Sequence, residues 1–212
     1  MVKQVIFDLD GTLIDSADSI IKSLQKTLSE NKIQPILQLE KSIIGPPLES
    51  TLKKITGFED PSIIACLIRD FKASYDDNYC KEATPYEGVD EMLRLLHRHS
   101  VVIHIATNKR AIPTKKILDY LSWASLFKSV YTVDMVTPKY ISKKVMLSSM
   151  LKKNNLTPKE TIYIGDINTD YFAANENGMG FIFVQWGYEG EGDYLYPSKA
   201  ANVQELIELI LR

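Results

Sequence analysis

Short apolar segments rich in β-branched residues recur along the 212-residue chain, and helical spacing separates them. The strongest are residues 3–7, 101–105, 161–164 and 181–184, and a weaker one spans 130–133. Between them, apolar residues return every three or four positions, as at Val89, Met92, Leu93 and Leu96. Continuous apolar strands alternating with amphipathic helices are typical of a parallel sheet covered on both faces. The pattern therefore predicts a doubly wound α/β fold.

One long region breaks this alternation. Residues 16–82 contain helical periodicities, including Leu24 and Leu28 and the later pair Leu52 and Ile55, but no strand pattern. We expect a small α-helical domain here, inserted after the first strand. Residues 1–15 and 83–212 would form the α/β core, and the segment 81–88 would return the chain to it.

Acidic side chains follow the ends of two predicted strands. Asp8 and Asp10 come after the first strand, Thr107 after the second, and Asp166 and Asp170 after the strand at 161–164. Parallel strands end at the same edge of a sheet, and ligands bind there. Several carboxylates with no histidine or cysteine among them suit a hard cation such as Mg²⁺. The spacing predicts a magnesium site at this edge.

Two other interpretations of these aspartates fit the sequence less well. A single aspartate at a strand end is most often a turn or helix-cap residue, and we expect this of Asp15. The stretch "DLDGTLIDSADS" also resembles a calcium-binding loop, but Leu13 stands where such a loop needs glycine and Ser19 where it needs glutamate. The conjunction of several acidic strand ends favours the metal site.

Composition excludes some partners. The formal net charge is −2 and the sequence pI is about 6.0, so nucleic acid is not expected as a major partner. We find no apolar run long enough for a membrane helix and no signal-peptide pattern, so we expect no membrane partner. Two cysteines without a nearby histidine do not indicate a zinc site. A cytoplasmic location is the default expectation.

Four motifs in order resemble those of haloacid-dehalogenase-superfamily phosphatases. They are "DLDGT" at residues 8–12, Thr107 followed by Asn108, a lysine before a long helix, and "GDINTD" at 165–170. The helical insertion lies where this family carries its small cap, and "IGPPLES" at 44–50 resembles a cap loop of phosphoglycolate-phosphatase-like and nucleotidase-like members. The resemblance covers essentially the whole chain and implies a Rossmann-like core with a helical cap.

The resemblance implies roles for the first motif. Asp8 would bind the metal and attack phosphorus, forming an aspartyl-phosphate. Asp10 would act as general acid and base, and would give the metal only its backbone carbonyl. Gly11 would allow a tight turn and close approach of the backbone to the phosphate. An aspartate at position 10 also favours phosphoryl transfer over carbon–halogen cleavage.

The other motifs would complete the site. By resemblance, Thr107 and Asn108 bind phosphate and Asp166 is a side-chain metal ligand. Asp170 would bind the metal through a water or position the active-site lysine. Arg110 is a candidate for meeting an anionic leaving group.

The lysine motif departs from the common family pattern, which is Lys-Pro-x-Pro. The stretch "TPKYISKKVML" offers three lysines. Counting back from Gly165 favours Lys143, with Lys139 second and Lys144 third. The chosen lysine would pair with the phosphate and with Asp8.

The sequence thus predicts a Mg²⁺-dependent phosphomonoester hydrolase acting on a small phosphorylated metabolite. Phosphoglycolate, a nucleoside monophosphate and a sugar phosphate all fit. A phosphomutase of the same superfamily is the close alternative, and a non-catalytic phosphate-binding protein is an alternative of another class. The role of the segment 186–203 and the oligomeric state stay open.

Overall fold

A parallel sheet with strand order β5-β4-β1-β6-β7-β8 forms the centre of the computed structural model, which describes residues 4–188 and 195–212. The strands are β1 (Gln4–Phe7), β4 (Val102–Thr107), β5 (Ser129–Thr132), β6 (Thr161–Gly165), β7 (Gly180–Val184) and β8 (Lys199–Ala200). β1 lies between β4 and β6, with Phe7 opposite Ile105 on one side and Ile164 on the other. This register aligns the carboxyl ends of the three central strands.

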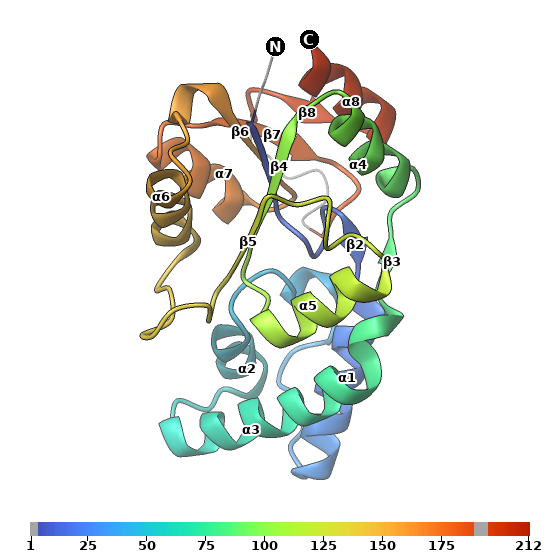
Figure 1. Cartoon of the computed structure of the whole chain (residues 1–212). Coiled ribbons are helices and arrows are strands. Elements are labelled where there is room, and N and C mark those ends of the chain that lie inside the picture. The colour runs from blue at the N-terminus through green and yellow to red at the C-terminus, as the bar shows by residue number, and fades with distance from the viewer. Residues whose placement is uncertain (1–3, 189–194) are drawn as a thin grey trace.

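Helices cover both faces of the sheet (Figure 1). Helices α4 (Val89–Arg98), α5 (Ala111–Tyr120) and α8 (Val203–Leu211) join one apolar cluster, and α6 (Lys143–Lys153) and α7 (Asn168–Glu176) join the other. Successive strand residues point to opposite faces, so Val5 and Phe7 pack in the first cluster and Ile6 in the second. The strands are apolar on both sides because both faces are covered. The predicted α/β fold class is confirmed.

The inserted region is helical. It contains α1 (Ala17–Glu30), η1 (Lys41–Ile43), α2 (Leu48–Thr56), α3 (Pro61–Ser74), the π-helical turn η2 (Tyr75–Tyr79) and η3 (Cys80–Glu82). Local signals place these ends: Asp60 caps α3 with Pro61 as its first residue, and Gly57 ends α2 in the left-handed conformation. Figure 1 shows α1, α2 and α3 grouped beyond the carboxyl edge of the sheet. We call this region the cap.

Two short strands mark the passage between core and cap. β2 (Ile14–Asp15) pairs antiparallel with β3 (Thr84–Pro85). The division expected at residues 15–16 and 82–83 falls beside this pair and stays a prediction. Neither this pair nor β8 was predicted, because two residues cannot display a periodicity.

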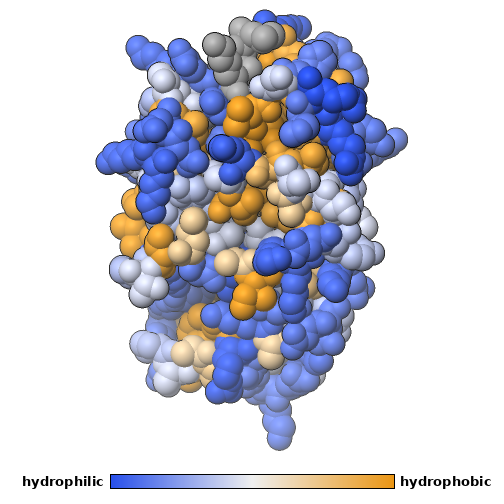
Figure 2. Space-filling model, viewed as in Figure 1, coloured by the Kyte–Doolittle hydropathy of each residue, from blue (hydrophilic) through white to orange (hydrophobic). Residues whose placement is uncertain are grey.

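The surface alternates between polar and apolar areas. In the view of Figure 2, hydrophobic residues gather towards the middle of the molecule and hydrophilic residues flank them.

Over the described residues, no helix combines the length and the apolar character that crossing a membrane requires. A short 3₁₀ turn, η4 (Pro158–Glu160), leads into β6.

Candidate active site

Three strand ends and one helix start bring the predicted acidic residues together. Asp8 follows β1, Thr107 ends β4 and Asp166 follows β6, so the parallel register places them along one edge. Asp170 lies in the first turn of α7, four residues after Asp166. One carboxylate oxygen from each of Asp8, Asp166 and Asp170 lies within 4.8 Å of the others, and all three residues are buried.

Lys143 is the lysine that meets this cluster. Its ammonium lies 2.8 Å from Asp8 Oδ2 and donates a hydrogen bond to Asp170 Oδ1 at 2.7 Å. The Ser142 side chain caps α6 by accepting a hydrogen bond from Val145 N, so Lys143 is the first residue of the helix. The helix start thus directs this lysine into the site.

The two other candidate lysines lie elsewhere. Lys139 pairs with Glu49 at 3.1 Å, and Lys144 pairs with Glu176 at 3.2 Å. Their side chains are 57% and 54% exposed, whereas that of Lys143 is 4% exposed. Lys143, the first choice from the spacing, is therefore the one of the three that lies beside Asp8.

Burial and crowding make the carboxylate cluster electrostatically demanding. Burial raises the pKa of Asp8 to about 6, although the nearby Lys143 ammonium acts to lower it. Burial, and then the charges of Asp170 and Asp8, raise the pKa of Asp166 well above its ordinary value. Asp8 Oδ1 is buried and has no hydrogen-bond partner among the described residues. An orphaned buried oxygen beside two more carboxylates fits a divalent cation, which would offset their repulsion.

Asp166 is held by two neighbouring loops. Thr12 Oγ1 donates a hydrogen bond to Asp166 Oδ1 at 3.1 Å, and the backbone N–H of Tyr188 donates to Oδ2 at 2.8 Å. The backbone approaches so closely that a Cβ at Gly11 or at Gly187 would lie 2.1 Å from an Asp166 atom. Gly187 therefore has a steric role that the sequence analysis had left open. Residues 189–194 of the segment 186–203 lie outside the described part of the chain.

Asp10 has separate partners. Its Oδ1 accepts hydrogen bonds from Ser16 Oγ at 2.5 Å and from the ammonium of Lys109 at 2.8 Å. The same ammonium donates to the hydroxyl of Tyr75, a cap residue, at 2.7 Å. The Asp10 carboxylate thus lies apart from the cluster, whereas the Asp170 carboxylate lies within it and accepts a hydrogen bond from Lys143 at 2.7 Å.

Lys109 is a site residue that the sequence analysis missed. It is buried, lines the cavity described below and follows Thr107 by two positions. The available signal was its proximity to the second motif, but most lysines are solvated and its partner Tyr75 is distant in sequence. Its two partners come from opposite sides of the core–cap junction.

The remaining predicted residues contact the cap or the local backbone. Asn108 Nδ2 donates a hydrogen bond to the backbone carbonyl of Gly45 at 3.0 Å. The guanidinium of Arg110 donates to both carboxylate oxygens of Asp76, at 2.9 and 2.5 Å. Thr107 is buried at the end of β4, and its Oγ1 accepts from the backbone N–H of Lys109 at 3.1 Å. Asn108 and Arg110 therefore join core to cap.

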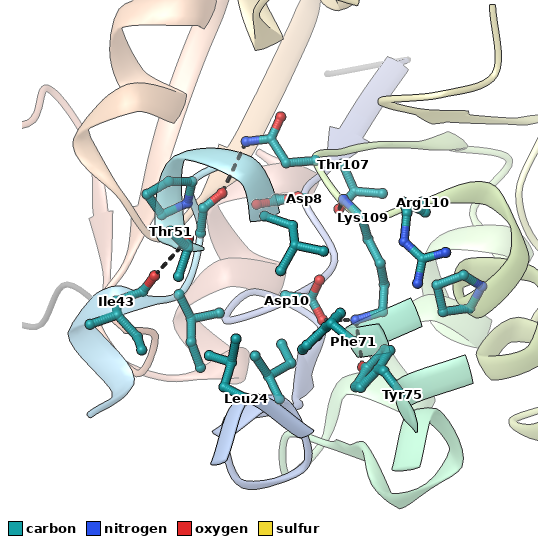
Figure 3. A pocket seen from close by; sticks show the side chains of 17 residues that line it. Asp8, Asp10, Leu24, Ile43, Thr51, Phe71, Tyr75, Thr107, Lys109 and Arg110 are labelled. Carbon is teal, nitrogen blue, oxygen red and sulfur yellow. Dashed lines mark hydrogen bonds and ion pairs between the residues drawn. The ribbon is translucent and has the colours of Figure 1, made fainter. Parts of the chain in front are cut away.

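A cavity of about 90 Å³ opens onto Asp8, Asp10 and Thr107. Figure 3 shows apolar cap side chains on one side of it and the polar residues of the strand ends on the other. In the same view Lys109 extends between Asp10 and Tyr75. The cavity is the space in which a small ligand would meet the acidic cluster.

The fold and this arrangement define the protein as an α/β protein with an inserted helical cap and a carboxylate-rich site at the carboxyl edge of its sheet. The model of the haloacid dehalogenase-like hydrolase family matches residues 5–184. The chain therefore belongs to the haloacid dehalogenase-like hydrolase family.

The relatives include named phosphatases, and a protein named as a tyrosine-protein kinase of Mycobacterium tuberculosis also matches, at 27% identity over 97% of this chain and 72% of its own length. The chain is 27% identical over 214 residues to a phosphoglycolate phosphatase of Xylella fastidiosa, covering 99% of this chain and 92% of the relative. It is 25% identical over 190 residues to a 5'-nucleotidase of Pseudomonas aeruginosa, covering 89% and 85%. The solved structure of a predicted phosphatase from Clostridium acetobutylicum matches with a TM-score of 0.89 at 26% identity, covering 100% and 99%. These findings confirm the resemblance and the prediction of a phosphatase-type enzyme, while the relatives' substrates differ.

Proposed function

We propose that this protein is a Mg²⁺-dependent phosphomonoesterase that hydrolyses small phosphate esters through an aspartyl-phosphate on Asp8. One observation carries the proposal. Asp8 Oδ2 is 2.8 Å from the Lys143 ammonium, its buried Oδ1 has no partner among the described residues, and the Asp8 carboxylate belongs to the three-aspartate cluster. The carboxylate is thus oriented by a cation at one oxygen, as a nucleophile approaching an anionic phosphate requires.

Asp8, Asp166 and Asp170 would hold the metal, with the backbone carbonyl of Asp10 as a further ligand by family resemblance. The donor set consists of hard oxygens, which suits Mg²⁺. When bound, the ion supplies charge neutralisation and Lewis acidity toward the phosphoryl group. Tyr188 N–H and Thr12 Oγ1 orient Asp166 for this purpose.

Four residues of the chain share the steps of the proposed reaction. Asp8 attacks phosphorus, the phosphorus–oxygen ester bond breaks, and Asp10 gives a proton to the leaving alkoxide. Asp10 then takes a proton from a water that attacks the phosphorus of the aspartyl-phosphate, which releases phosphate and restores Asp8. Lys143 and Thr107 hold the phosphoryl oxygens, and the ammonium of Lys143 offsets the charge that develops on them.

A phosphomutase is less well supported. Retaining a second phosphate needs a free cation on the cap side of the cavity. Among the described lining residues, the cap contributes apolar side chains together with Tyr75 and Thr51. No observation favours this alternative over hydrolysis.

The proposal is tested by phosphate release from a panel of small phosphomonoesters, with Mg²⁺ and with EDTA. Asp8→Asn keeps the shape of the side chain and removes the nucleophile. We expect it to reduce kcat by at least about 10³-fold, and EDTA to abolish wild-type turnover. Turnover that survives in folded Asp8→Asn, or in EDTA, would contradict the proposed mechanism.

A further inference from the structure

The cap contributes the apolar wall of the cavity. Its lining includes Ile20, Leu24, Ile44, Leu48 and Phe71. The cap hydroxyl of Thr51 is directed to the backbone carbonyl of Ile43 at 3.3 Å and is therefore engaged. Apolar side chains of this kind favour an apolar leaving group, because such a group gains by leaving water and loses no hydrogen bonds.

Both cations of the cavity lining are already paired. Lys109 is bound to Asp10 and Tyr75, with its side chain 5% exposed. Arg110 is bound through two hydrogen bonds to Asp76, with its side chain 13% exposed. Among the described lining residues the charged ones are Asp8, Asp10, Lys109 and Arg110, so acidic and basic groups balance. No cation is left over for a second anionic group on a substrate.

This arrangement disfavours a substrate with a carboxylate next to its phosphate. Such a group would be buried against apolar side chains, or would have to take Arg110 from Asp76, and an unpaired buried charge is costly. The size of the cavity adds a limit, since about 90 Å³ is smaller than the roughly 150 Å³ that holds one benzene molecule in an engineered protein core. With the cap in this position, the cavity suits a small leaving group better than a nucleoside.

From this wall and these pairs we propose that the enzyme acts on phosphomonoesters whose leaving group is small, uncharged and largely apolar. It discriminates against esters that carry a second anionic group, such as phosphoglycolate. This inference rests on the proposed phosphomonoesterase function. Specificity of this kind comes from the cap, whereas the phosphoryl group is handled by the core.

Three esters test the inference with the wild-type protein and Mg²⁺: propyl phosphate, phosphoglycolate and adenosine monophosphate. Propyl phosphate resembles phosphoglycolate in size and lacks the carboxylate. We expect its kcat/KM to exceed that of phosphoglycolate by at least about 10-fold, since the carboxylate would be buried without a partner. Adenosine monophosphate should be turned over more slowly than propyl phosphate.

The outcomes separate the two proposals. Equal or faster turnover of phosphoglycolate would overturn the substrate class and leave the phosphomonoesterase intact. Turnover of adenosine monophosphate without turnover of the other two esters would also overturn the substrate class and leave the phosphomonoesterase intact. Hydrolysis of none of the three esters, nor of any in the wider panel, would overturn both proposals.

Asp76→Asn tests the role of the Arg110 pair. It removes the counter-charge of Arg110, so the guanidinium becomes available to a substrate carboxylate. We expect the ratio of kcat/KM for phosphoglycolate to that for propyl phosphate to rise at least about 5-fold. Asp76→Glu keeps the charge and should leave the ratio close to that of the wild type. The ratio is measured in one preparation, so it does not depend on the folded fraction.

Leu48→Arg is the second variant, in case Asp76→Asn does not fold. Leu48 is half-buried at the start of α2 and lines the cavity. An arginine there would supply the missing cation and should raise the same ratio, while Leu48→Met, which adds no charge, should not. An unchanged ratio in both Asp76→Asn and Leu48→Arg would overturn the explanation.

Discussion

The core wall and the cap wall of the cavity differ in the charge of their side chains. The core wall concentrates buried charge: three aspartates that each place one carboxylate oxygen within 4.8 Å of the others, and a lysine bound to two of them. The cap wall is apolar, and the cations beside it are neutralised by Asp10 and Asp76. A reactive site requires charges that are not fully neutralised by their neighbours. A pocket that selects an uncharged leaving group requires that no charge in it be left unpaired.

The two walls also differ in how well they tolerate amino-acid substitutions. Residues of the core wall are fixed by strand ends, a helix start and close backbone approach, so small shifts there affect the chemistry. The cap wall is assembled from helix faces and a loop, where one apolar side chain can replace another of similar volume at modest cost. We therefore expect large catalytic effects on the core side and changes in substrate preference on the cap side.

Lys143→Met should give the largest effect. It removes the cation that orients Asp8 and offsets phosphate charge, so kcat/KM for propyl phosphate should fall by about 10³-fold. Circular dichroism would establish that the variant is folded. Lys144→Met is the matched control, because Lys144 is its exposed neighbour and pairs with Glu176; its kcat/KM should stay within about 2-fold of the wild type. Equal losses in the two variants would refute the assignment.

Gly187→Ala should come next. The added Cβ would lie 2.1 Å from Asp166 Cβ, so either Asp166 or the loop that donates the Tyr188 N–H must move. Displacing a group that orients a metal ligand typically costs about 10–100-fold in metal affinity or activity. We expect the Mg²⁺ concentration for half-maximal activity to rise by that factor. A normal Mg²⁺ dependence would show that the loop adapts.

Lys109→Met would remove the cation shared between core and cap. Asp10 loses a partner at 2.8 Å and Tyr75 one at 2.7 Å, so kcat should fall by about 10-fold. The free energy of unfolding should fall by about 3–5 kcal/mol, because a buried pair loses one member. Lys115→Met, at an exposed pair with Asp119, should change neither quantity measurably. A KM effect without a kcat effect would point to substrate binding instead of Asp10 positioning.

His104 allows a smaller prediction on stability, away from both walls. Burial, with a contribution from Lys128, lowers the pKa of His104 from 6.5 to about 4. The unfolded chain thus takes up a proton near pH 6.5 and the folded chain does not, so His104 reduces the unfolding free energy as the pH falls from 6.5 to 4. After allowance for solvent screening we expect a loss of about 1–2 kcal/mol.

The measurement compares urea unfolding of wild type and His104→Asn at pH 7 and pH 4.5 in EDTA. Asp8, whose pKa is raised to about 6, acts in the opposite direction, since its folded carboxyl gains a proton as the pH falls. That contribution is common to both proteins and cancels in the difference. A difference that does not change with pH would contradict the assignment to His104.

Much of the fold followed from local patterns. The five apolar segments correspond to β1, β4, β5, β6 and β7, because strands buried on both faces are apolar without interruption. Pairs such as β2–β3 escaped prediction, since their pairing brings together residues about seventy positions apart in the chain. For the site, the strand-end rule led to Asp8, Thr107 and Asp166, and the spacing before α6 favoured Lys143.

What the amino-acid order settles here is local: where strands and helices form, and which acidic motifs stand at their ends. The partners of those motifs are a property of the tertiary structure. Lys109 meets Tyr75, Arg110 meets Asp76 and Gly187 meets Asp166 only after the cap and the last strands have packed against the core. No periodicity encodes such contacts, because they depend on distances between segments that are remote in sequence. The same packing decides which charges are left unpaired, and hence which substrates the cavity admits.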